Sequence, residues 1–292
     1  MKKVLITGID SFTGTHLSSC LCNAGYDIYG TSLSRNSSKK YRCDITKKSD
    51  ITKVLNEVRP DFIIHLSGIS FAAHGDAEDF YKVNTIGTTN ILEVLVELEL
   101  NPKKVILVSS ATVYGNQGKE LLEESMCPKP VNHYGISKLS MEHMAANYFD
   151  KLSIIITRPF NYTGVGQASH FLIPKIVEHF KEGKKEIELG NIHVAREFND
   201  VNFVVDAYHK LLLSQEKSAV VNLSSNRPVK LLDVINMMQE IAGYEISIKV
   251  NPAFVRANEI KSLAGSTDKL KKIIDISFES TLKSTLTEMY ES

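Results

Sequence analysis

The sequence lacks any excess of charge, because its 292 residues include 34 basic and 34 acidic side chains. A balanced chain has no global electrostatic field that would attract nucleic acid or an anionic membrane surface. We therefore predict neither nucleic acid nor a membrane as a partner. A phosphate-bearing ligand would have to be held by local groups.

Paired cysteines and long apolar runs are also missing. The four cysteines, Cys20, Cys22, Cys43 and Cys127, form no CxxC pair, so we expect neither a disulfide framework nor a zinc site. No stretch approaches the ~20 apolar residues of a membrane span, and residues 1–3 lead directly into a predicted strand rather than a signal peptide. These absences predict a cytoplasmic protein without a bound metal.

What the sequence does contain is a regular alternation of predicted strands and helices. This alternation predicts βαβ units around a parallel sheet. It stops after about residue 165. A chain of 292 residues lies near the upper limit for a single core, so two lobes with a shared cleft are expected. We predict an α/β, Rossmann-type doubly wound domain over residues 1–165, a segment near 200–210 that returns to it, and a smaller α/β lobe over residues 166–292.

One stretch combines a buried strand with hydroxyl side chains. Residues 105–108 (VILV) end in Ser109 and Ser110, which places hydroxyl groups at the carboxyl edge of the sheet, where open α/β folds bind ligands. Tyr134 and Lys138 lie four residues apart in a predicted helix and so share one face of it. By itself, such a pair would be an ordinary exposed pair on an amphipathic helix.

Beside the serine-tipped strand, the same pair predicts acid–base chemistry. A free phenol titrates near ~10, and a neighbouring ammonium favours the phenolate. We therefore assign Tyr134 as the general acid or base, Lys138 as the group that lowers its pKa, and Ser110 as a hydrogen-bond partner of the same substrate oxygen.

The first predicted strand, residues 3–7, runs into a turn that contains glycine. Gly8 and Gly14 let the backbone approach a pyrophosphate, which would then lie on the free N–H groups of the following helix. Ser11 stands where a third glycine would be expected, which leaves the tightness of that packing open. The position of this turn, before a second strand about 20 residues later, indicates a dinucleotide site. We assign Gly8, Ser11, Phe12 and Gly14 to the cofactor.

The second predicted strand, residues 27–31, ends without the acid that NAD-binding proteins place against the ribose hydroxyls. Ser32 and Arg35 stand there instead and would accommodate a 2′-phosphate, so NADP(H) is favoured; alternatively, Arg35 is a solvated loop residue. His65 is interpreted as a hydrogen-bonded core residue, not a catalyst. Further cofactor contacts are assigned to residues that follow later strands: Asp44 (at the adenine edge), Ile45, Leu66, Ser67 and Gly68.

Together these motifs resemble the extended short-chain dehydrogenase/reductase family, in the branch that modifies nucleotide-activated sugars. The glycine turn, the run SATVYG at 110–115 and the run YGISK at 134–138 match its three signatures in order and spacing, and the resemblance covers nearly the whole chain. It implies a nucleotide-sugar substrate and a catalytic role for Ser110, Tyr134 and Lys138. The segments RPFN at 158–161 and REFNDV at 196–201 look most like the GDP-4-keto-6-deoxy-D-mannose reductases.

The residues after the catalytic serine separate the reactions of this family. Its 4,6-dehydratases carry an acid at the position of Thr112, whereas Ala111 and Thr112 cannot act as general bases near neutral pH. We expect NADPH-dependent reduction of the C4 ketone of a nucleotide-linked 4-keto-6-deoxyhexose, with GDP favoured and dTDP, UDP and CDP left open. The alternatives are a 4-epimerase or epimerase/reductase and, in another class, a non-catalytic NADP-binding sensor.

The resemblance also implies substrate contacts and a quaternary structure. Family members commonly pair through two helices, here 77–98 and 134–148, so a two-fold homodimer is expected. The alternative is that the apolar faces of these helices only pack on the sheet. The residues assigned to the substrate are Thr112, Asn161, Arg196, Arg256 and Glu259.

Overall fold

The large lobe is built on one parallel sheet. The computed structural model describes residues 1–34, 37–70, 76–255, 262–277 and 280–292. Within them, seven strands pair in the order β12-β7-β5-β4-β1-β2-β3, each parallel to its neighbours. The predicted doubly wound α/β fold is therefore confirmed. The strands are β1 (Lys3–Thr7), β2 (Asp27–Ser32), β3 (Lys40–Arg42), β4 (Phe62–His65), β5 (Lys104–Val108), β7 (Ile154–Pro159) and β12 (Ala219–Leu223).

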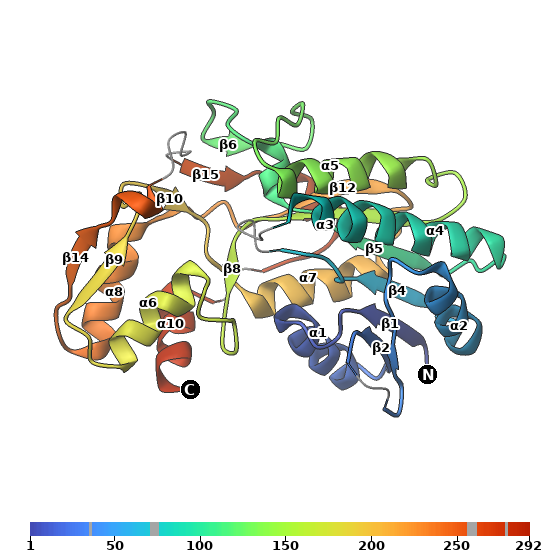
Figure 1. Cartoon of the computed structure of the whole chain (residues 1–292), viewed down its shortest axis with the longest axis horizontal. Helices are drawn as coiled ribbons and strands as arrows, with labels where there is room; N and C mark the ends of the chain where they lie inside the picture. The colour runs from blue at the N-terminus through green and yellow to red at the C-terminus, as the bar shows by residue number, and fades with distance from the viewer. Residues whose placement is uncertain (35–36, 71–75, 256–261, 278–279) are drawn as a thin grey trace.

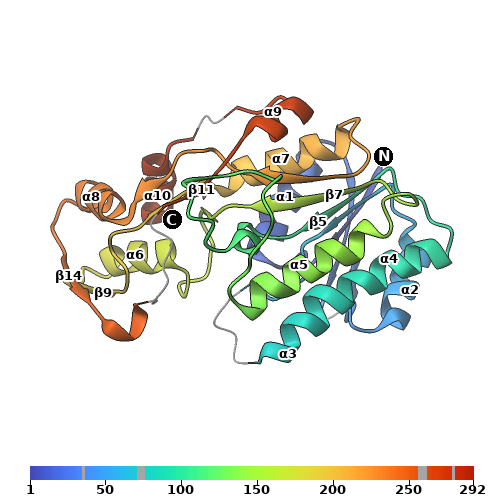
Figure 2. The same ribbon diagram turned by 90° about the horizontal axis from the view of Figure 1, so that it is seen from above.

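Helices cover both faces of this sheet, as Figures 1 and 2 show. Successive strand residues point to opposite faces, so Val4 and Ile6 pack into one core and Leu5 into the other. The first core is closed by α1 (Phe12–Asn23), α7 (Val201–Leu213) and α9 (Asp268–Ile273). The second face carries α2 (Lys48–Val58), α3 (Ala77–Phe80), the π-helix η1 (Tyr81–Gly87), α4 (Thr88–Glu97) and α5 (His133–Ala146).

The small lobe has a separate apolar core, to which Ile176, Val234, Met238 and Leu286 belong. Its short strands form a four-stranded sheet in the order β13-β10-β15-β6 and two pairs, β14 with β9 and β11 with β8. Its helices are α6 (Leu172–Lys181), α8 (Leu231–Ala242) and α10 (Leu282–Glu291), with the 3-10 turn η3 (Pro252–Phe254). A second 3-10 turn, η2 (Ala111–Tyr114), follows β5 of the large lobe and contacts α5. The strands are β6 (Leu121–Leu122), β8 (Tyr162–Thr163), β9 (Glu186–Leu189), β10 (Ala195–Arg196), β11 (Asn199–Asp200), β13 (Val229–Lys230), β14 (Ser247–Val250) and β15 (Ser262–Gly265).

A single boundary at residue 165 does not divide the chain into its two lobes, because later and earlier segments cross between them. The segment that returns to the large lobe is longer than the predicted 200–210, because α7 packs into the first core and β12 pairs with β7. In the other direction, β6 belongs to the small sheet through its pairing with β15. These crossings hold the two lobes together at the carboxyl edge of the large sheet. None of the described helices is long and apolar enough to cross a membrane.

Candidate active site

The glycine turn after β1 is tightly packed. Gly8 has φ +70°, a left-handed backbone that favours glycine, and a Cβ on Gly14 would lie 2.5 Å from the Gly8 carbonyl oxygen. Ser11 has an ordinary φ of −69° and caps α1, since its side chain accepts a hydrogen bond from the Gly14 N–H at 3.1 Å. A third glycine is therefore not required at this place. The start of α1 therefore lies directly against the backbone of the turn. This arrangement suits a pyrophosphate-binding site, in which the free N–H groups at the start of a helix bind the ligand.

The strand β5 delivers Ser110 to the carboxyl edge of the sheet. The Ser110 hydroxyl accepts hydrogen bonds from the N–H of Thr112 at 3.2 Å and from its hydroxyl at 2.9 Å. The Tyr134 phenol, at the start of α5, interacts with the Ser110 side chain, which acts to lower the pKa of the phenol. Asn132 caps this helix by accepting from the Gly135 N–H at 2.8 Å. The structure thus brings Ser110, Thr112 and Tyr134 together at the carboxyl edge of the sheet.

Lys138 lies one turn after Tyr134, but its ammonium does not lower the pKa of the phenol. Its Nζ donates to the Val108 carbonyl oxygen at 2.7 Å, and burial lowers its own pKa to about 8. Burial raises the pKa of Tyr134 to about 12, against a smaller lowering by the Ser110 hydrogen bond. The predicted direction of the tyrosine shift is therefore wrong, because desolvation of the phenol dominates. At neutral pH the phenol keeps its proton, which suits a proton donor.

The side chain of Asn84 links the loop after β4 to α5, the helix that carries Tyr134 and Lys138. The Asn84 side chain accepts from the Ile69 N–H at 2.8 Å and donates to the Ser137 hydroxyl at 3.1 Å. A Cβ placed on Gly68, in this loop, would lie 3.3 Å from Lys138 Nζ. Asn84 comes from η1, and π-helical turns are frequent at functional sites. Sequence analysis did not assign this role to Asn84, although a polar residue among the apolar positions of a predicted helix could have indicated it.

A buried ion pair lies next to the residues that are assigned to catalysis. Arg158, in β7, donates to Glu142 through Nε at 3.0 Å and through Nη2 at 2.6 Å. The two side chains are only 5% and 6% exposed. The same carboxylate accepts from the Ser109 hydroxyl at 2.5 Å, and the guanidinium lies 4.8 Å from the centre of the Tyr114 ring. Sequence analysis did not identify this pair, which supports both β5 and α5 next to the site.

At the far end of the glycine turn, the structure brings an acid to the end of β2. The N–H groups of Gly8 and Ile9 donate to the Thr31 carbonyl oxygen at 2.9 and 3.1 Å. Asp10, the next residue, accepts a hydrogen bond from the Ser34 hydroxyl at 3.1 Å. An acid of the turn, Asp10, therefore lies beside the end of β2, where the sequence itself has none. Arg35 lies outside the described residues.

The other residues assigned to the cofactor follow β3 and β4. Asp44 accepts from the Thr46 N–H at 3.0 Å and from its hydroxyl at 2.7 Å. Ile45 is buried in the second core, and Leu66 packs against the first. The Ser67 N–H donates to the Thr7 hydroxyl at 3.1 Å.

His65 is a core residue, as interpreted from the sequence. Its two ring nitrogens form hydrogen bonds with the hydroxyl groups of Thr7 at 2.7 Å and Thr88 at 2.9 Å. Burial lowers the pKa of His65 to about 3, so the imidazole is neutral across the physiological range.

The residues assigned to the substrate are only partly brought together. The hydroxyl of Thr112 donates a hydrogen bond to that of Ser110. Asn161, by contrast, is exposed after β7. Arg196 is mostly buried and lies in β10 of the small lobe. Arg256 and Glu259 lie outside the described residues.

Sequence analysis missed one further residue, Tyr162. Its hydroxyl lies 2.7 Å from that of Thr13, and its ring stacks on Phe12. This contact joins the first helix to the segment that enters the small lobe.

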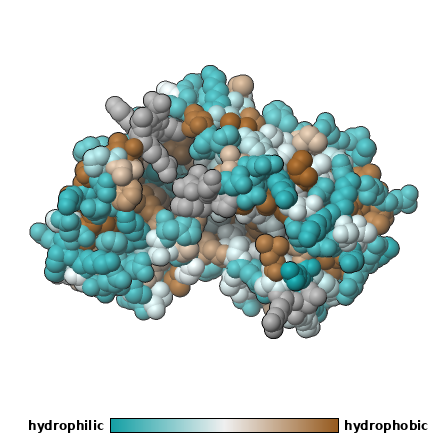
Figure 3. Space-filling view, in the orientation of Figure 1, coloured by the Kyte–Doolittle hydropathy of each residue, from teal (hydrophilic) through white to brown (hydrophobic). Residues whose placement is uncertain are grey.

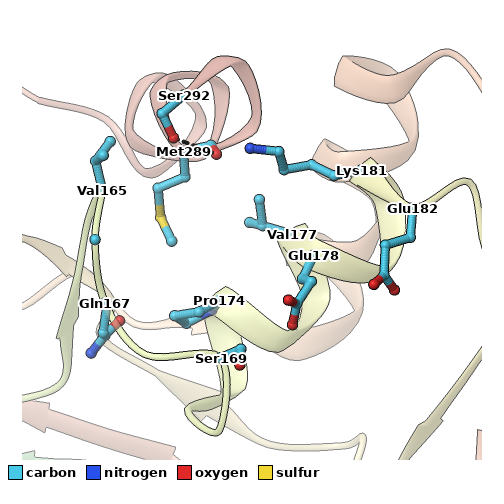
Figure 4. Close-up of a pocket in the computed structure, with 11 residues that line it drawn as sticks. Val165, Gln167, Ser169, Pro174, Val177, Glu178, Lys181, Glu182, Met289 and Ser292 are labelled. Atoms are coloured by element: carbon cyan, nitrogen blue, oxygen red, sulfur yellow. Dashed lines mark hydrogen bonds between the residues drawn. The ribbon is translucent and has the colours of Figure 1, made fainter.

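The outline of the molecule is indented between the lobes on the face that Figure 3 shows. A separate cavity of about 380 Å³ lies in the small lobe between α6, α10 and the segment after β8 (Figure 4). Its lining includes Gln167, Glu178, Lys181 and Met289 and none of the residues assigned to catalysis or to the cofactor. We therefore place the candidate active site at the sheet edge and not in this cavity.

A parallel sheet with a pyrophosphate cradle at its first turn and a Ser–Tyr–Lys group at its carboxyl edge defines a dinucleotide-binding enzyme of the Rossmann type. The chain belongs to the NAD dependent epimerase/dehydratase family, whose sequence profile matches residues 4–224. This confirms the family predicted from the sequence and, with it, the prediction of an enzyme.

Two curated relatives match along nearly their whole length. GDP-6-deoxy-D-talose 4-dehydrogenase of Aggregatibacter actinomycetemcomitans is 34% identical over 292 residues, covering 99% of this chain and 97% of the relative. GDP-6-deoxy-D-mannose reductase of Pseudomonas aeruginosa is 29% identical over 296 residues, covering 98% and 95%. Among solved structures, RMD from Pseudomonas aeruginosa complexed with NADPH has a TM-score of 0.89 at 27% identity, covering 100% of this chain and 98% of that one.

Proposed function

We propose that the protein is an oxidoreductase that uses NADPH to reduce the C4 ketone of a GDP-linked 4-keto-6-deoxyhexose. The observation that carries this proposal is the full-length similarity to two enzymes whose names specify GDP-linked 6-deoxyhexoses, one of them a 4-dehydrogenase. The site supports it, because Ala111 and Thr112 offer no general base for a dehydration. The NADPH complex of the related RMD supports the choice of cofactor.

The side chains of the site match the needs of a ketone reduction. Bound NADPH would supply a hydride to C4 of the sugar. Ser110 and Thr112 would hydrogen bond the carbonyl oxygen, and Tyr134 would donate its proton to that oxygen as negative charge develops there. Lys138, at the Gly68 loop, would hold the nicotinamide ribose. Asn161 and Arg196 would bind the nucleotide part. The products are the C4 alcohol and NADP⁺, and water reprotonates Tyr134.

The test is a panel of nucleotide-linked 4-keto-6-deoxyhexoses carrying GDP, dTDP, UDP or CDP, each mixed with the purified protein and NADPH. We expect the absorbance of the reduced cofactor to fall in proportion to the GDP-linked ketone added. An epimerase would isomerise its sugar nucleotide without net oxidation of NADPH. Tight NADPH binding without turnover on any member of the panel would instead indicate a sensor.

We also infer a two-fold homodimer. The helices α4 and α5 lie side by side (Figure 2), and η1 precedes α4. Exposed apolar side chains come from η1 and α5: Ile86 is 52%, Ile136 38% and Met144 39% exposed. Burying these side chains against a second copy would remove apolar surface from water. Light scattering at micromolar concentration should therefore give a dimer. The double variant Ile86→Lys with Met144→Lys should be monomeric, and Leu213→Lys, on α7, should remain dimeric. A monomeric unmodified protein would contradict this inference.

A further inference from the structure

A polar cluster lies where the glycine turn meets the end of β2. It consists of Asp10, Ser32, Ser34 and Lys40. The hydroxyl oxygens of Ser32 and Ser34 are 2.6 Å apart, and Ser34 donates to the Asp10 carboxylate at 3.1 Å. Lys40, the first residue of β3, forms an ion pair with the other carboxylate oxygen at 2.7 Å. Segments that are distant in the sequence thus meet around one carboxylate and one ammonium.

The cluster is placed to meet the adenosine ribose of a dinucleotide. In this fold the pyrophosphate lies on the first turn of α1, and the ribose lies beside the end of the second strand. The Asp10 side chain is 47% exposed and that of Lys40 is 29% exposed, so both can contact a ligand. The Lys40 hydrogen bond is the main cause that lowers the pKa of Asp10. The carboxylate is therefore ionised at neutral pH.

The two charges have opposite effects on the two cofactors. A carboxylate accepts a hydrogen bond from the 2′-hydroxyl of NADH but repels the 2′-phosphate of NADPH, which carries a charge of about −2. An ammonium attracts that phosphate and offers it charge-assisted hydrogen bonds. Because Asp10 and Lys40 are paired, neither charge acts on the ribose alone.

We propose that the Asp10–Lys40 ion pair sets the preference between NADH and NADPH. Asp10 accepts from a 2′-hydroxyl, whereas Lys40, together with the hydroxyl groups of Ser32 and Ser34, binds a 2′-phosphate. This assignment rests on the proposed nicotinamide-dependent function and adds the residues that determine its cofactor specificity. They come from the glycine turn and from β3, not only from the residues that follow β2.

The test measures the dissociation constants of NADH and NADPH by fluorescence titration, without substrate. Asp10→Asn should raise the preference for NADPH by about tenfold or more, because it removes the repulsion and releases Lys40. Lys40→Met should shift the ratio toward NADH by about tenfold, and Lys40→Arg should keep it within about twofold of the unmodified protein. Neither Asp10 nor Lys40 caps a helix, since Ser11 caps α1.

The neighbouring ion pair of Asp27 with Lys39 is a matched control. It joins the start of β2 to the residue before Lys40, at 2.5 Å, and it lies away from the glycine turn. Asp27→Asn and Lys39→Met should leave the NADPH/NADH ratio unchanged. If Asp10→Asn and Lys40→Met behaved like these controls while both dinucleotides still bound, the inference would be overturned and the proposed function would stand. If the unmodified protein bound neither dinucleotide, the proposed function itself would fail.

Discussion

Replacing Tyr134 with phenylalanine should lower turnover by roughly 10² to 10⁴-fold while leaving NADPH binding nearly intact. The ring and its packing remain, and only the transferable proton is lost. Because burial raises the pKa of Tyr134 to about 12, the native phenol is protonated at neutral pH and available as the donor. The measurement is the steady-state rate on a reducible 4-keto sugar nucleotide, beside a cofactor titration of the same variant.

Two other variants divide the roles within the site. Lys138→Ala should weaken both turnover and cofactor binding, because the ammonium is assigned to the nicotinamide ribose. Ser110→Ala should reduce turnover through lost polarisation of the carbonyl and spare cofactor binding. If Tyr134→Phe kept more than about a tenth of the native rate, the proton would have to come from another residue or from water. The catalytic assignment would then be wrong.

Glu142→Gln should lower the free energy of unfolding by about 3 to 5 kcal/mol. Glutamine keeps the size of the side chain, but it leaves the Arg158 guanidinium buried without its counter-charge. Both partners are at most 6% exposed, so water cannot replace the lost carboxylate. Urea unfolding followed by circular dichroism measures the change. The variant also removes the acceptor of the Ser109 hydrogen bond next to Ser110, so we expect turnover to fall as well.

A pair on the surface supplies the control for this variant. Asp206 and Lys210 form an ion pair at 2.8 Å on α7, with 42% and 37% of their side chains exposed. Asp206→Asn should cost at most about 1 kcal/mol, because water screens such a pair. Adding Arg158→Met to Glu142→Gln should recover part of the lost stability, since no uncompensated charge remains. Equal costs for the buried and the exposed pair would refute the argument.

Local patterns in the sequence were sufficient to predict the scaffold and the placement of Tyr134 and Lys138 on one helix. Runs such as residues 105–108 (VILV) predict buried strands, and the glycine turn predicts a sharp entry into a helix. The spacing of Tyr134 and Lys138 places them on one helical face, whatever surrounds that helix. The interpretation of His65 as a core residue was confirmed for the same reason, since a histidine within an apolar strand is surrounded by the sheet. Such features depend only on neighbours along the chain.

Contacts between distant segments were decided by the tertiary structure alone. Asp10 reaches the end of β2 because β1 and β2 are adjacent and parallel, and Glu142 meets Arg158 because α5 packs over the strands beside β7. Likewise, β12 joins the large sheet from a part of the sequence where alternation had ceased. The pKa of Tyr134 belongs to this group, because it depends on how much water the folded chain removes from the phenol. Strand order and burial are properties of the whole chain path, and no local periodicity encodes them.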